Sequence, residues 1–419
     1  MTRFLLVCPP LVSHVRAFEA VGEALVARGH AVAFLLNAGG GALVGSPRVA
    51  VWETGAFEPG PALTDRPTGL FGILRTVREG AARTASLCRE GPGLAARWGA
   101  EAVLADQMEP AGALLAEHQG VPFLSIAAAL PIDPDPAIPS PFLGWPFDPS
   151  PEGRKRNRGG ERVARLLLRR QRETLRAACF DLGLRPRERM EDCLSPLATL
   201  SQTVPGFDYP RPDASRLHAL GPFRARGGAG EELPFRRDRA RPLVFASLGT
   251  LQGHRLGVFQ AVARACRRIG AQLAVAHCGR LSAAEAGLID ADVVTDFLPQ
   301  RAVLAEADLC VSHAGLNTVL DAMEAGVPVL ALPIAYDQPG VAARLLHHGA
   351  GLRLSHRRLH AGEVADALAL MLRDPSFRRN AARIGREILS AGGSEAAADW
   401  AERLLVSPVP ARAREPEPA

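Results

Sequence analysis

The chain has 419 residues, 47% of them hydrophobic, which is too long for one ordinary core, so we expect two domains of about 200 residues each. Charged residues make up 22% and aromatic residues 5%, which excludes a disordered or fibrous chain over most of the length. The formal net charge is +5, and ten Lys/Arg against two Asp/Glu lie between Arg154 and Arg176. The rest of the chain is therefore slightly acidic, which argues against a general nucleic-acid binder.

Cysteine usage and hydropathy indicate the cellular compartment. Seven cysteines lie far apart with no CxxC pair, which argues against a disulfide framework or a structural zinc site and is typical of a reduced compartment. No apolar run reaches the roughly 18 residues of a membrane span. The run Phe4–Cys8 is too short for the core of a signal peptide. The sequence therefore predicts a cytoplasmic protein.

The first half of the chain alternates between predicted strands and helices. Short apolar runs predict strands at Phe4–Cys8, Ala31–Leu36, Val49–Trp52, Ala102–Ala105 and Val121–Ile126. Apolar residues at helical spacing predict a helix from Val15 to Arg28, ended by Gly29. This alternation predicts a parallel sheet with helices on both faces.

The alternation stops between Pro131 and Gly160, where prolines and glycines are frequent. Three aromatic residues lie in this stretch, namely Phe142, Trp145 and Phe147. A surface loop and a partly buried wall or lid of a binding site fit the pattern equally well. If the second interpretation holds, the three aromatic side chains contact an acceptor molecule.

A second interruption, Gly221–Arg241, is rich in Gly, Pro and charged residues and is typical of an interdomain linker. The alternation then resumes, with strands predicted at Leu243–Ser247, Gln272–His277, Val293–Thr295, Leu309–Ser312 and Val329–Leu332 and helices at Val258–Ile269 and Leu316–Ala325. We therefore predict an α/β protein of two doubly wound, Rossmann-like domains. Residues 1–220 form the first, 221–241 the linker, 242–406 the second, and 407–419 a disordered tail.

The stretch 296–338 carries the most specific signals. In it the strand Leu309–Ser312 ends, a turn of small residues follows, and a helix begins near Leu316. Free N–H groups and the positive dipole end of that helix form a binding site for an anion. The polar side chains that can add donors there are His313, Asn317 and Thr318. One turn further on, Asp321 is placed to accept hydrogen bonds from a ribose diol.

The topology predicts one crevice in each half. In a doubly wound sheet of order 3-2-1-4-5, strands 1 and 4 are neighbours, and ligands bind beyond their carboxyl ends. In the second half the residues at those ends include Ser247, Gly249, Thr250, His313 and Gly315. In the first half they include His14 and Asp106, which are therefore expected to meet.

His14 and Asp106 together suit the transfer of a sugar to an alcohol. Displacing a diphosphate from an anomeric carbon requires a base for the alcohol proton, and histidine is well matched to that task near neutral pH. A carboxylate on the second ring nitrogen fixes the tautomer and stabilises the imidazolium. Taken alone, His14 would more simply be a loop histidine packed near a helix start.

The stretch 296–338 resembles the nucleotide-sugar signature of the inverting GT-B UDP-glycosyltransferases. The residues that carry the resemblance are Pro299, Gln300, His313, Gly315, Asn317, Asp321, Gly326, Val327, Pro328, Asp337 and Gln338. The opening CPPLVSHVRAFEAVGEALVARGHAV and the run SHAGLNTVLDAMEAGVPVLALPIAYDQP are similar to bacterial zeaxanthin glucosyltransferases, which glucosylate carotenoid hydroxyls. The resemblance implies a GT-B fold, in which two Rossmann-like domains face each other across a cleft.

The resemblance also implies a role for each matching residue. Phe297 and Gln300, with Leu298 between them, would flank uracil and ribose, and Asp321 would hold the ribose hydroxyls. The diphosphate would be held by His313, Asn317, Thr318 and Thr250, with Ser247, Gly249 and Gly315 beside it. Sugar hydroxyls would be bound by Asp337 and Gln338, and His14 would be the catalytic base, oriented by Asp106. Plant members have Trp at the positions of Phe297 and Leu316 and Glu at that of Asp321.

We therefore expect an inverting glycosyltransferase that moves glucose from UDP-glucose to a hydroxyl of an apolar acceptor such as the carotenoid zeaxanthin. No cofactor or metal is expected, because Asp133-Pro134-Asp135 resembles a metal-binding DxD motif only in letters and lies among prolines. The alternatives are a macrolide or polyketide glycosyltransferase that uses a UDP- or dTDP-sugar, a UDP-sugar epimerase, and a nucleotide-sugar-binding protein without catalysis.

The basic segment Arg154–Arg176 contains Val163, Leu166, Leu167 and Leu168 between its arginines. It is either a solvated basic helix or an amphipathic helix that rests on anionic lipid. The second interpretation would add a peripheral membrane contact to an otherwise cytoplasmic protein.

Overall fold

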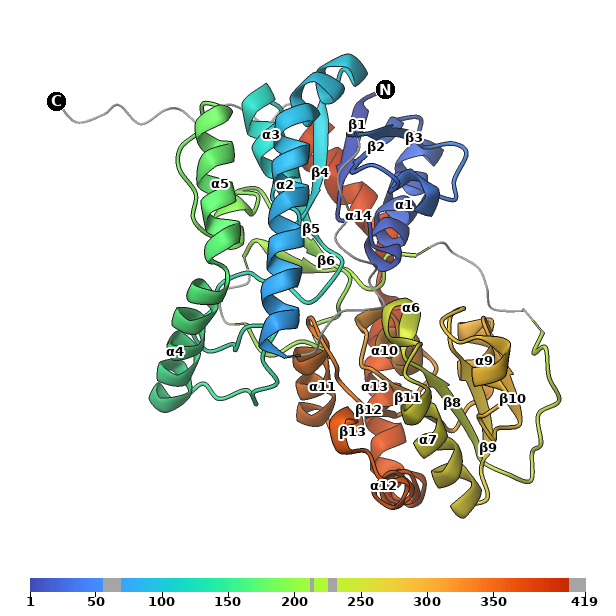
Figure 1. The fold of residues 1–419 in the computed structure, drawn as a ribbon. Coiled ribbons are helices and arrows are strands. Elements are labelled where there is room, and N and C mark those ends of the chain that lie inside the picture. The colour runs from blue at the N-terminus through green and yellow to red at the C-terminus, as the bar shows by residue number, and fades with distance from the viewer. Residues whose placement is uncertain (56–68, 212–214, 225–231, 407–419) are drawn as a thin grey trace.

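The structure, a computed structural model, describes residues 1–55, 69–211, 215–224 and 232–406. Part of the predicted linker, residues 225–231, and the whole predicted tail, residues 407–419, lie outside the described residues. Two parallel sheets, each covered by helices, lie one above the other in the view of Figure 1. This arrangement confirms the predicted fold class of two doubly wound α/β units.

The first sheet has the strand order β3-β2-β1-β4-β5-β6-β7, and all its pairings are parallel. Its strands are β1 (Arg3–Val7), β2 (Ala31–Leu36), β3 (Ala50–Glu53), β4 (Ala102–Asp106), β5 (Phe123–Ala127), β6 (Thr199–Ser201) and β7 (Leu217–Ala219). The predictions for the first five are confirmed to within two residues. The last two were missed because three residues are too few to show a strand pattern.

The second sheet has the strand order β10-β9-β8-β11-β12-β13, again parallel throughout. Its strands are β8 (Leu243–Ser247), β9 (Gln272–Ala276), β10 (Val293–Thr295), β11 (Leu309–Ser312), β12 (Val329–Ala331) and β13 (Gly351–Arg353). Strand β1 pairs with β4, and β8 pairs with β11. Each sheet therefore has the two neighbouring strands that the predicted crevices require.

Helices cover both faces of both sheets. Those between the strands of the first sheet are α1 (Val12–Ala27), α2 (Leu70–Trp98), α3 (Ala111–Gln119), α4 (Pro151–Leu167) and α5 (Arg169–Asp181). Those that follow are α6 (Gly249–Gln252), α7 (Leu256–Arg268), α8 (Ala283–Ala286), α9 (Gln300–Glu306), α10 (Leu316–Glu324), α11 (Gln338–His347), α12 (Ala361–Arg373), α13 (Pro375–Ser390) and α14 (Gly393–Ala401). Single turns lie at Gly41–Leu43, Met190–Cys193 and His356–Arg358, and Glu402–Val406 continues from α14.

Two helix starts differ from the sequence-based expectation. The first helix begins at Val12, so His14 lies in its first turn and not in the preceding loop. The segment Pro131–Gly160 is not irregular throughout, because α4 begins at Pro151. There the Ser150 hydroxyl accepts a hydrogen bond from the Gly153 N–H at 3.1 Å, and a proline stands in the first helical turn. These are ordinary helix-starting signals, hidden here by the many neighbouring prolines and glycines.

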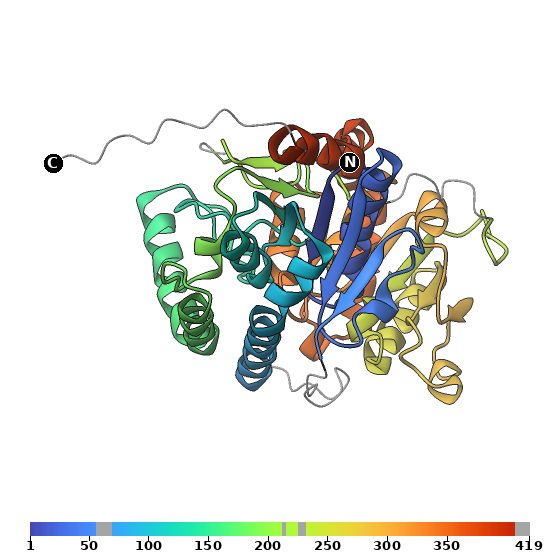
Figure 2. The ribbon, with the colours of Figure 1, turned by 90° about the horizontal axis from the view of Figure 1, so that it is seen from above.

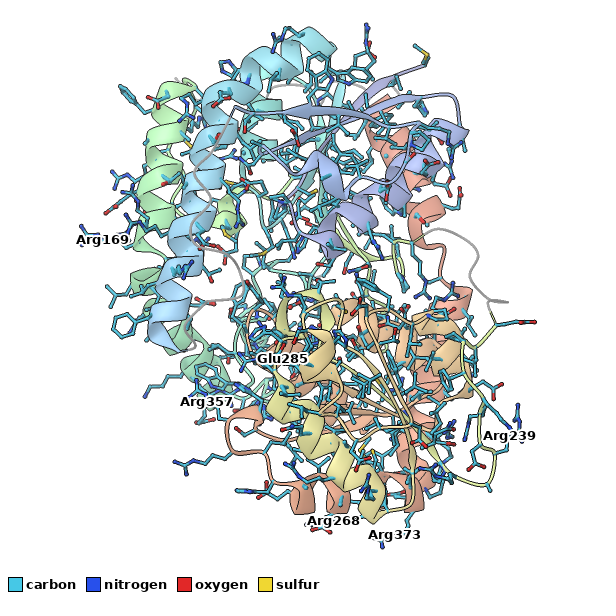
Figure 3. All side chains as sticks on the ribbon, turned by 45° about the vertical axis from the view of Figure 1, so that its right-hand side comes forward. Arg169, Arg239, Arg268, Glu285, Arg357 and Arg373 are labelled. Atoms are coloured by element: carbon cyan, nitrogen blue, oxygen red, sulfur yellow. The ribbon has the colours of Figure 1, made fainter. Side chains whose placement is uncertain are left out.

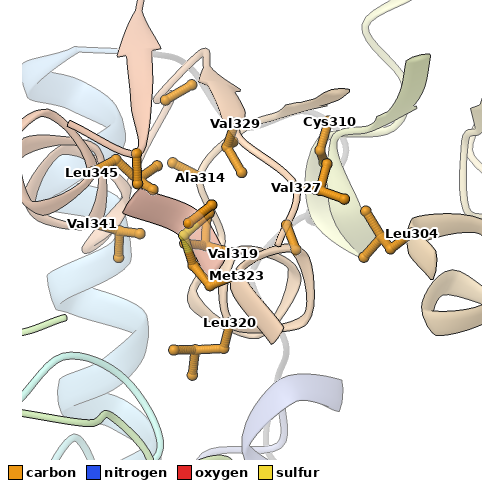
Figure 4. Packing of buried hydrophobic residues seen from close by; sticks show 14 of the residues in the cluster. Leu304, Cys310, Ala314, Val319, Leu320, Met323, Val327, Val329, Val341 and Leu345 are labelled. Carbon is orange, nitrogen blue, oxygen red and sulfur yellow. The ribbon is translucent and has the colours of Figure 1, made fainter. Parts of the chain in front are cut away.

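Apolar faces of the helices hold the layers together. Helix α1 buries Phe18, Val21 and Leu25 against the first sheet, at a spacing of three and four residues. Burial of each such side chain contributes about 1.5–3 kcal/mol. Helix α10 packs in the same way under the second sheet, where Val319 and Met323 lie among side chains of β12 and α11 (Figure 4). Both helices that begin at the predicted crevices are therefore firmly positioned.

The last helix packs on the first sheet, although the predicted second domain extends to residue 406. Ala397, Ala398 and Ala401 of α14 belong to the same buried cluster as Phe18 of α1. In Figure 2 the red C-terminal helix lies beside the blue N-terminal strands and α1. Amphipathic periodicity shows that a helix has a buried face, but it does not show which sheet covers that face.

The chain passes between the two units twice, and the two passages touch. The Gly393 N–H donates to the Leu220 carbonyl oxygen at 2.7 Å. A Cβ atom built on Gly221 would lie 2.5 Å from that of Ala391. The backbones at residues 220–221 and 391–393 therefore run side by side.

Candidate active site

His14 and Asp106 form a buried pair at the crevice of the first sheet. Asp106 is the last residue of β4, and His14 lies in the first turn of α1, the helix that follows the neighbouring strand β1. His14 Nδ1 and Asp106 Oδ2 are 2.7 Å apart, and the two residues are 8% and 1% exposed. The second carboxylate oxygen of Asp106 accepts from the Met108 N–H at 2.7 Å. The contacts with Met108 and His14 thus fix the orientation of the Asp106 carboxylate, and this carboxylate in turn orients the His14 ring.

The surroundings of His14 favour its protonated form. Burial by itself would lower the pKa of the imidazole, but the charge and hydrogen bond of Asp106, together with the charge of Asp337, outweigh burial and raise the pKa of His14. Because Asp106 occupies Nδ1, the other nitrogen, Nε2, is left for a ligand. The structure therefore brings together the predicted pair in the geometry of a carboxylate-oriented base.

His313, at the crevice of the second sheet, lies between two glycines. A Cβ atom at Gly249 would lie 2.7 Å from its Cε1 atom, and one at Gly315 would lie 2.6 Å from its Nε2 atom. Gly249 also has φ +69°, a conformation that favours glycine. Burial lowers the pKa of His313 to about 4, so the ring is neutral at pH 7. Both glycines are therefore required by the position of this ring.

The start of α10 offers unpaired backbone donors. Gly315 precedes the helix, and within the described residues no side chain caps it. The preceding turn is tight, because Ala314 has φ +64° and its N–H donates to the Ser312 hydroxyl at 3.2 Å. The first N–H groups of a helix carry a partial positive charge. The geometry therefore matches the anion-binding site predicted from the sequence.

Gln300, Thr318 and Asp321 form one hydrogen-bonded cluster. Gln300 Nε2 donates to Asp321 Oδ2 at 2.7 Å, and the Thr318 hydroxyl donates to Gln300 Oε1 at 3.3 Å. Burial raises the pKa of Asp321, although Arg224, whose guanidinium pairs with this carboxylate, and Gln300 oppose the effect. Phe297 is 68% exposed just before α9, whereas Leu298 packs against the buried core.

A cleft of about 720 Å³ opens between α1 and the second unit. On one side it is lined by Arg16, Ala20 and Glu23 of α1, and on the other by Gln300, Asn317 and Asp321. Neither His14 nor His313 is among its lining residues. The cleft thus covers the Gln300–Asp321 end of the predicted donor site.

Asp337, from the second unit, acts on the His14 site of the first. Its Oδ2 atom accepts from the Leu130 N–H at 3.2 Å. Burial raises the pKa of Asp337, while the Leu130 hydrogen bond and the charge of His14 oppose this effect. The next residue, Gln338, uses its Oε1 atom to accept from the N–H groups of Ile334 and Ala335, both at 2.8 Å. These bonds fix the loop that presents Asp337 to the first unit.

The remaining predicted donor residues lie at the same crevice. The Ser247 hydroxyl accepts from the Gly249 N–H at 3.3 Å, and Thr250 is exposed. Asn317 Oδ1 accepts from Gln202 Nε2 at 2.8 Å, so the Asn317 side chain also links the two units. Sequence reasoning missed Gln202 because it follows the unpredicted strand β6. It also missed Arg224, although this residue stands two positions after the Gly-Pro start of the predicted linker.

The three aromatic residues proposed as acceptor contacts lie in a segment that packs on α4 and α11. The ring of Phe147 stacks on Tyr209 with centroids 5.2 Å apart, and Arg156 lies over the ring of Trp145. The Arg353 side chain donates to the Gly144 carbonyl oxygen at 3.0 Å, and Phe142 is partly exposed. Trp145 and Phe147 are thus each covered by protein on one face. The acceptor role of the three residues stays a prediction.

A buried ion pair joins the two units beside that segment. Arg344 of α11 is 1% exposed and donates through Nε to Asp208 Oδ1 at 2.7 Å. Its guanidinium carbon lies 4.3 Å from the centroid of the Tyr209 ring. Burial would raise the pKa of Asp208, but Arg344 and Arg211 outweigh it and lower the pKa to about 2. The loop that follows β6 is therefore bound firmly to the second unit.

The described residues include neither a cluster suited to a metal ion nor a helix suited to span a membrane. No group of three or more His, Cys, Asp or Glu side chains is arranged to hold a metal ion. No helix in the part of the chain that the structure describes combines the length and apolarity needed to cross a membrane.

The fold and the crevices define a glycosyltransferase of the GT-B class. The profile of the family "UDP-glucoronosyl and UDP-glucosyl transferase" matches residues 167–387, and the chain belongs to this family. The zeaxanthin glucosyltransferase of Pantoea ananas is 37% identical over 98% of this chain and 97% of its own length. That of Pseudescherichia vulneris is 38% identical over 97% and 98%.

A solved structure gives the same result for the fold. The calicheamicin glycosyltransferase superposes with a TM-score of 0.76 at 20% identity, over 98% of this chain and all of that one. This superposition confirms the predicted GT-B fold, and the family match with the two relatives confirms the predicted UDP-sugar transferase class.

Proposed function

We propose that the protein is an inverting glucosyltransferase that transfers glucose from UDP-glucose to a hydroxyl of a carotenoid such as zeaxanthin. The His14–Asp106 pair carries this proposal, because it is a buried base that lies beside the carboxylate of the facing domain. The two zeaxanthin glucosyltransferases, similar over nearly the whole chain, support this choice of donor sugar and acceptor.

The donor would lie across the strand ends of the second sheet. Uracil would stack on the exposed Phe297 beside Leu298, and the ribose hydroxyls would donate to Asp321, oriented by Gln300. The diphosphate would be held by the N–H groups at the start of α10 and by the donors at that crevice, which are His313, Asn317, Thr318 and Thr250. The glucose hydroxyls would bind Asp337 and Gln338. Ser247, Gly249 and Gly315 would leave room for the phosphates.

The proposed reaction is a single displacement. The acceptor oxygen forms a bond to the anomeric carbon of glucose while the bond from that carbon to the UDP oxygen breaks. His14 Nε2 takes the hydroxyl proton, and Asp106 stabilises the imidazolium that results. Attack from the side opposite the leaving group inverts the configuration at the anomeric carbon. General-base catalysis of this kind contributes roughly 10²–10⁴ in rate.

We propose that the protein itself stabilises the leaving diphosphate, without a metal. The positive end of α10 and a neutral His313, which can donate a hydrogen bond, lie where the negative charge would develop. Activity should therefore persist in the presence of a chelator such as EDTA. A requirement for added Mg²⁺ or Mn²⁺ would contradict this part of the proposal.

One incubation tests the proposal directly. Purified protein is mixed with UDP-glucose and detergent-dispersed zeaxanthin, and the glucoside is detected by chromatography and mass spectrometry. Parallel reactions replace UDP-glucose by dTDP-glucose, and zeaxanthin by a macrolide or a hydrophilic alcohol. Fast transfer to zeaxanthin from UDP-glucose supports the proposal. Preference for the macrolide or for the dTDP-sugar would contradict the proposed substrates, but it would still agree with the proposed glycosyl transfer.

The proposed acceptor also indicates where the enzyme works. A carotenoid partitions into the apolar phase of a bilayer, so we propose that an otherwise cytoplasmic enzyme meets it at the membrane surface.

A further inference from the structure

We propose that one flank of the first domain, formed by α4, the start of α5 and the start of α2, is a docking surface for an anionic lipid bilayer. The proposed function explains why such a surface would be useful, because a carotenoid acceptor lies in a membrane. The surface itself is defined by the charge and exposure of its side chains. We call the exposed side chains of this flank the α4 surface.

The α4 surface has a strong positive charge that the protein does not neutralise. Ten Lys/Arg and two Glu lie between residues 154 and 176. Among the described residues, Arg169, Arg170 and Arg176 pair with carboxylates, and the other seven do not, namely Arg154, Lys155, Arg156, Arg158, Arg162, Arg165 and Arg172. Arg169, which pairs with Glu173 at 2.8 Å, still points outward from this flank in Figure 3. A bilayer with anionic headgroups is the complementary surface.

Large apolar side chains are exposed among these charges. On α4, Val163 is 60% exposed and Leu166 is 73% exposed. Leu166 is four residues from Arg162, so both lie on one face of the helix. The opposite face contains the buried residues Gly153 and Asn157. A helix with exposed leucine and valine between arginines is the pattern of a segment that lies in the interface of a membrane.

The start of α2 extends the apolar part of this surface. Phe71 is 77% exposed, and Ile73 and Leu74 are also exposed. Helix α2 packs along α5 and touches α4, and the three helices lie side by side in Figures 1 and 2. The α4 surface therefore combines apolar and basic side chains from helices far apart in the sequence. Long arginine side chains can reach headgroup phosphates while leucine and phenylalanine enter the acyl boundary.

The chain connects this surface to the proposed active site. Near the start of the segment between β5 and α4, the Leu130 N–H donates to Asp337 Oδ2. Two residues further on, the Ile132 N–H donates to Gln107 Oε1 at 3.1 Å. Gln107 directly follows Asp106. The same segment ends at α4, where the Trp145 ring packs against Gly160. One continuous segment of the chain thus contacts both the α4 surface and the neighbourhood of the His14–Asp106 pair.

The test is flotation of the full-length protein with vesicles of phosphatidylcholine, with or without phosphatidylglycerol. The wild-type protein is expected to float with the anionic vesicles and to be released by added salt. The triple variant Arg158→Gln, Arg162→Gln, Arg165→Gln should bind anionic vesicles on the order of 100-fold more weakly, because each basic residue near such a surface contributes about 1 kcal/mol. The double variant Val163→Ser, Leu166→Ser should also bind more weakly.

Matched controls come from the second domain. The triple variant Arg264→Gln, Arg268→Gln, Arg373→Gln changes the same net charge at exposed sites of α7 and α12, and Figure 3 labels Arg268 and Arg373 at the end of the second domain away from α4. Leu370→Ser with Leu389→Ser removes two exposed leucines there. Both controls should float like the wild type. All variants should keep the circular dichroism spectrum and the thermal unfolding midpoint of the wild type, which shows that they are folded.

Three results would overturn the proposal. They are no flotation with anionic vesicles, equal flotation with neutral ones, and unchanged flotation of the α4 triple variant. Retention on heparin or RNA without vesicle binding would mean a nucleic-acid or acidic-protein surface, and it would also overturn the proposal. Flotation needs no substrate, so its outcome is independent of whether zeaxanthin is glucosylated.

Discussion

The crevices of the two sheets have the same topology and opposite electrostatics. In each, a histidine follows a strand end at the switch point of a parallel sheet. Asp106 and Asp337 raise the pKa of His14, whereas burial without a carboxylate partner lowers that of His313 to about 4. We propose that one residue type serves as a base in one domain and as a neutral donor in the other. His14 lies in α1 after β1, whereas His313 directly follows β11, so the positions of the two rings differ as well as their neighbours.

This difference shows that the fold supplies positions and that the residues around each position supply the chemistry. The first crevice presents a carboxylate beside the ring, at 2.7 Å. The second presents two glycines, which leave space for the ring itself, and burial lowers the pKa of that ring. We therefore propose the second crevice for the diphosphate and the first for the proton acceptor.

The largest expected effect comes from removing the base. His14→Ala should lower kcat by roughly 10²–10⁴ because the acceptor hydroxyl then loses its proton acceptor. UDP binding, measured by calorimetry, should be unchanged, since the donor contacts lie in the other domain. His313→Ala is the matched comparison, and it should instead weaken UDP binding. An unchanged kcat in His14→Ala would show that His14 is not the catalytic base.

Crowding the second crevice should affect the donor and not the base. Gly249→Ala places a Cβ atom 2.7 Å from His313 and requires a non-glycine residue at φ +69°. Overpacking of this kind costs about 1–3 kcal/mol, so the Kd for UDP should rise about 10- to 100-fold. The control is Gly257→Ala on α7, where a Cβ atom would meet no neighbour within 4 Å. Equal UDP affinity in both variants would contradict the proposed phosphate position.

The ion pair that holds the two domains together should contribute to stability. Arg344→Met leaves the Asp208 carboxylate buried with less compensation, and the free energy of unfolding should fall by about 3 kcal/mol in urea denaturation. Arg383→Met is the control, because Arg383 forms a half-exposed pair with Glu387 that is worth less than about 1 kcal/mol. Equal decreases in the free energy of unfolding would show that the buried Arg344–Asp208 pair contributes no more to stability than the half-exposed Arg383–Glu387 pair.

The smallest effect is a shift in pH dependence. A base must be unprotonated to act, so kcat/KM should rise as pH rises through the raised pKa of His14. Asp106→Asn removes the main cause of that raised pKa, and the acid limb of the profile should move to lower pH. Asp337→Asn should move it less in the same direction. If the acid limb of the kcat/KM profile stays at the same pH in Asp106→Asn, the group that titrates there is not His14.

The sequence predicted the parts of the site that lie at strand ends. His14 with Asp106, and His313 with Gly249, were placed together because strands 1 and 4 of a doubly wound sheet are neighbours. Contacts between the domains were not predicted. Gln202 with Asn317 and Arg344 with Asp208 join loops and helices whose docking leaves no periodic pattern in the sequence. The contacts of Trp145 with Arg156 and of Phe147 with Tyr209 lie within the first domain and were not predicted either.

The paired passages at residues 220–221 and 391–393 restrict how the lobes can swing. Because two backbones run side by side there and are joined by the Leu220–Gly393 hydrogen bond, we expect any swing of one lobe against the other to pivot at this place, beside Gly221, Gly392 and Gly393. Opening would widen the gap most at the far side, away from this pivot. It also follows that neither lobe can be excised with one cut, since a fragment ending at residue 220 would lack the helix that covers α1.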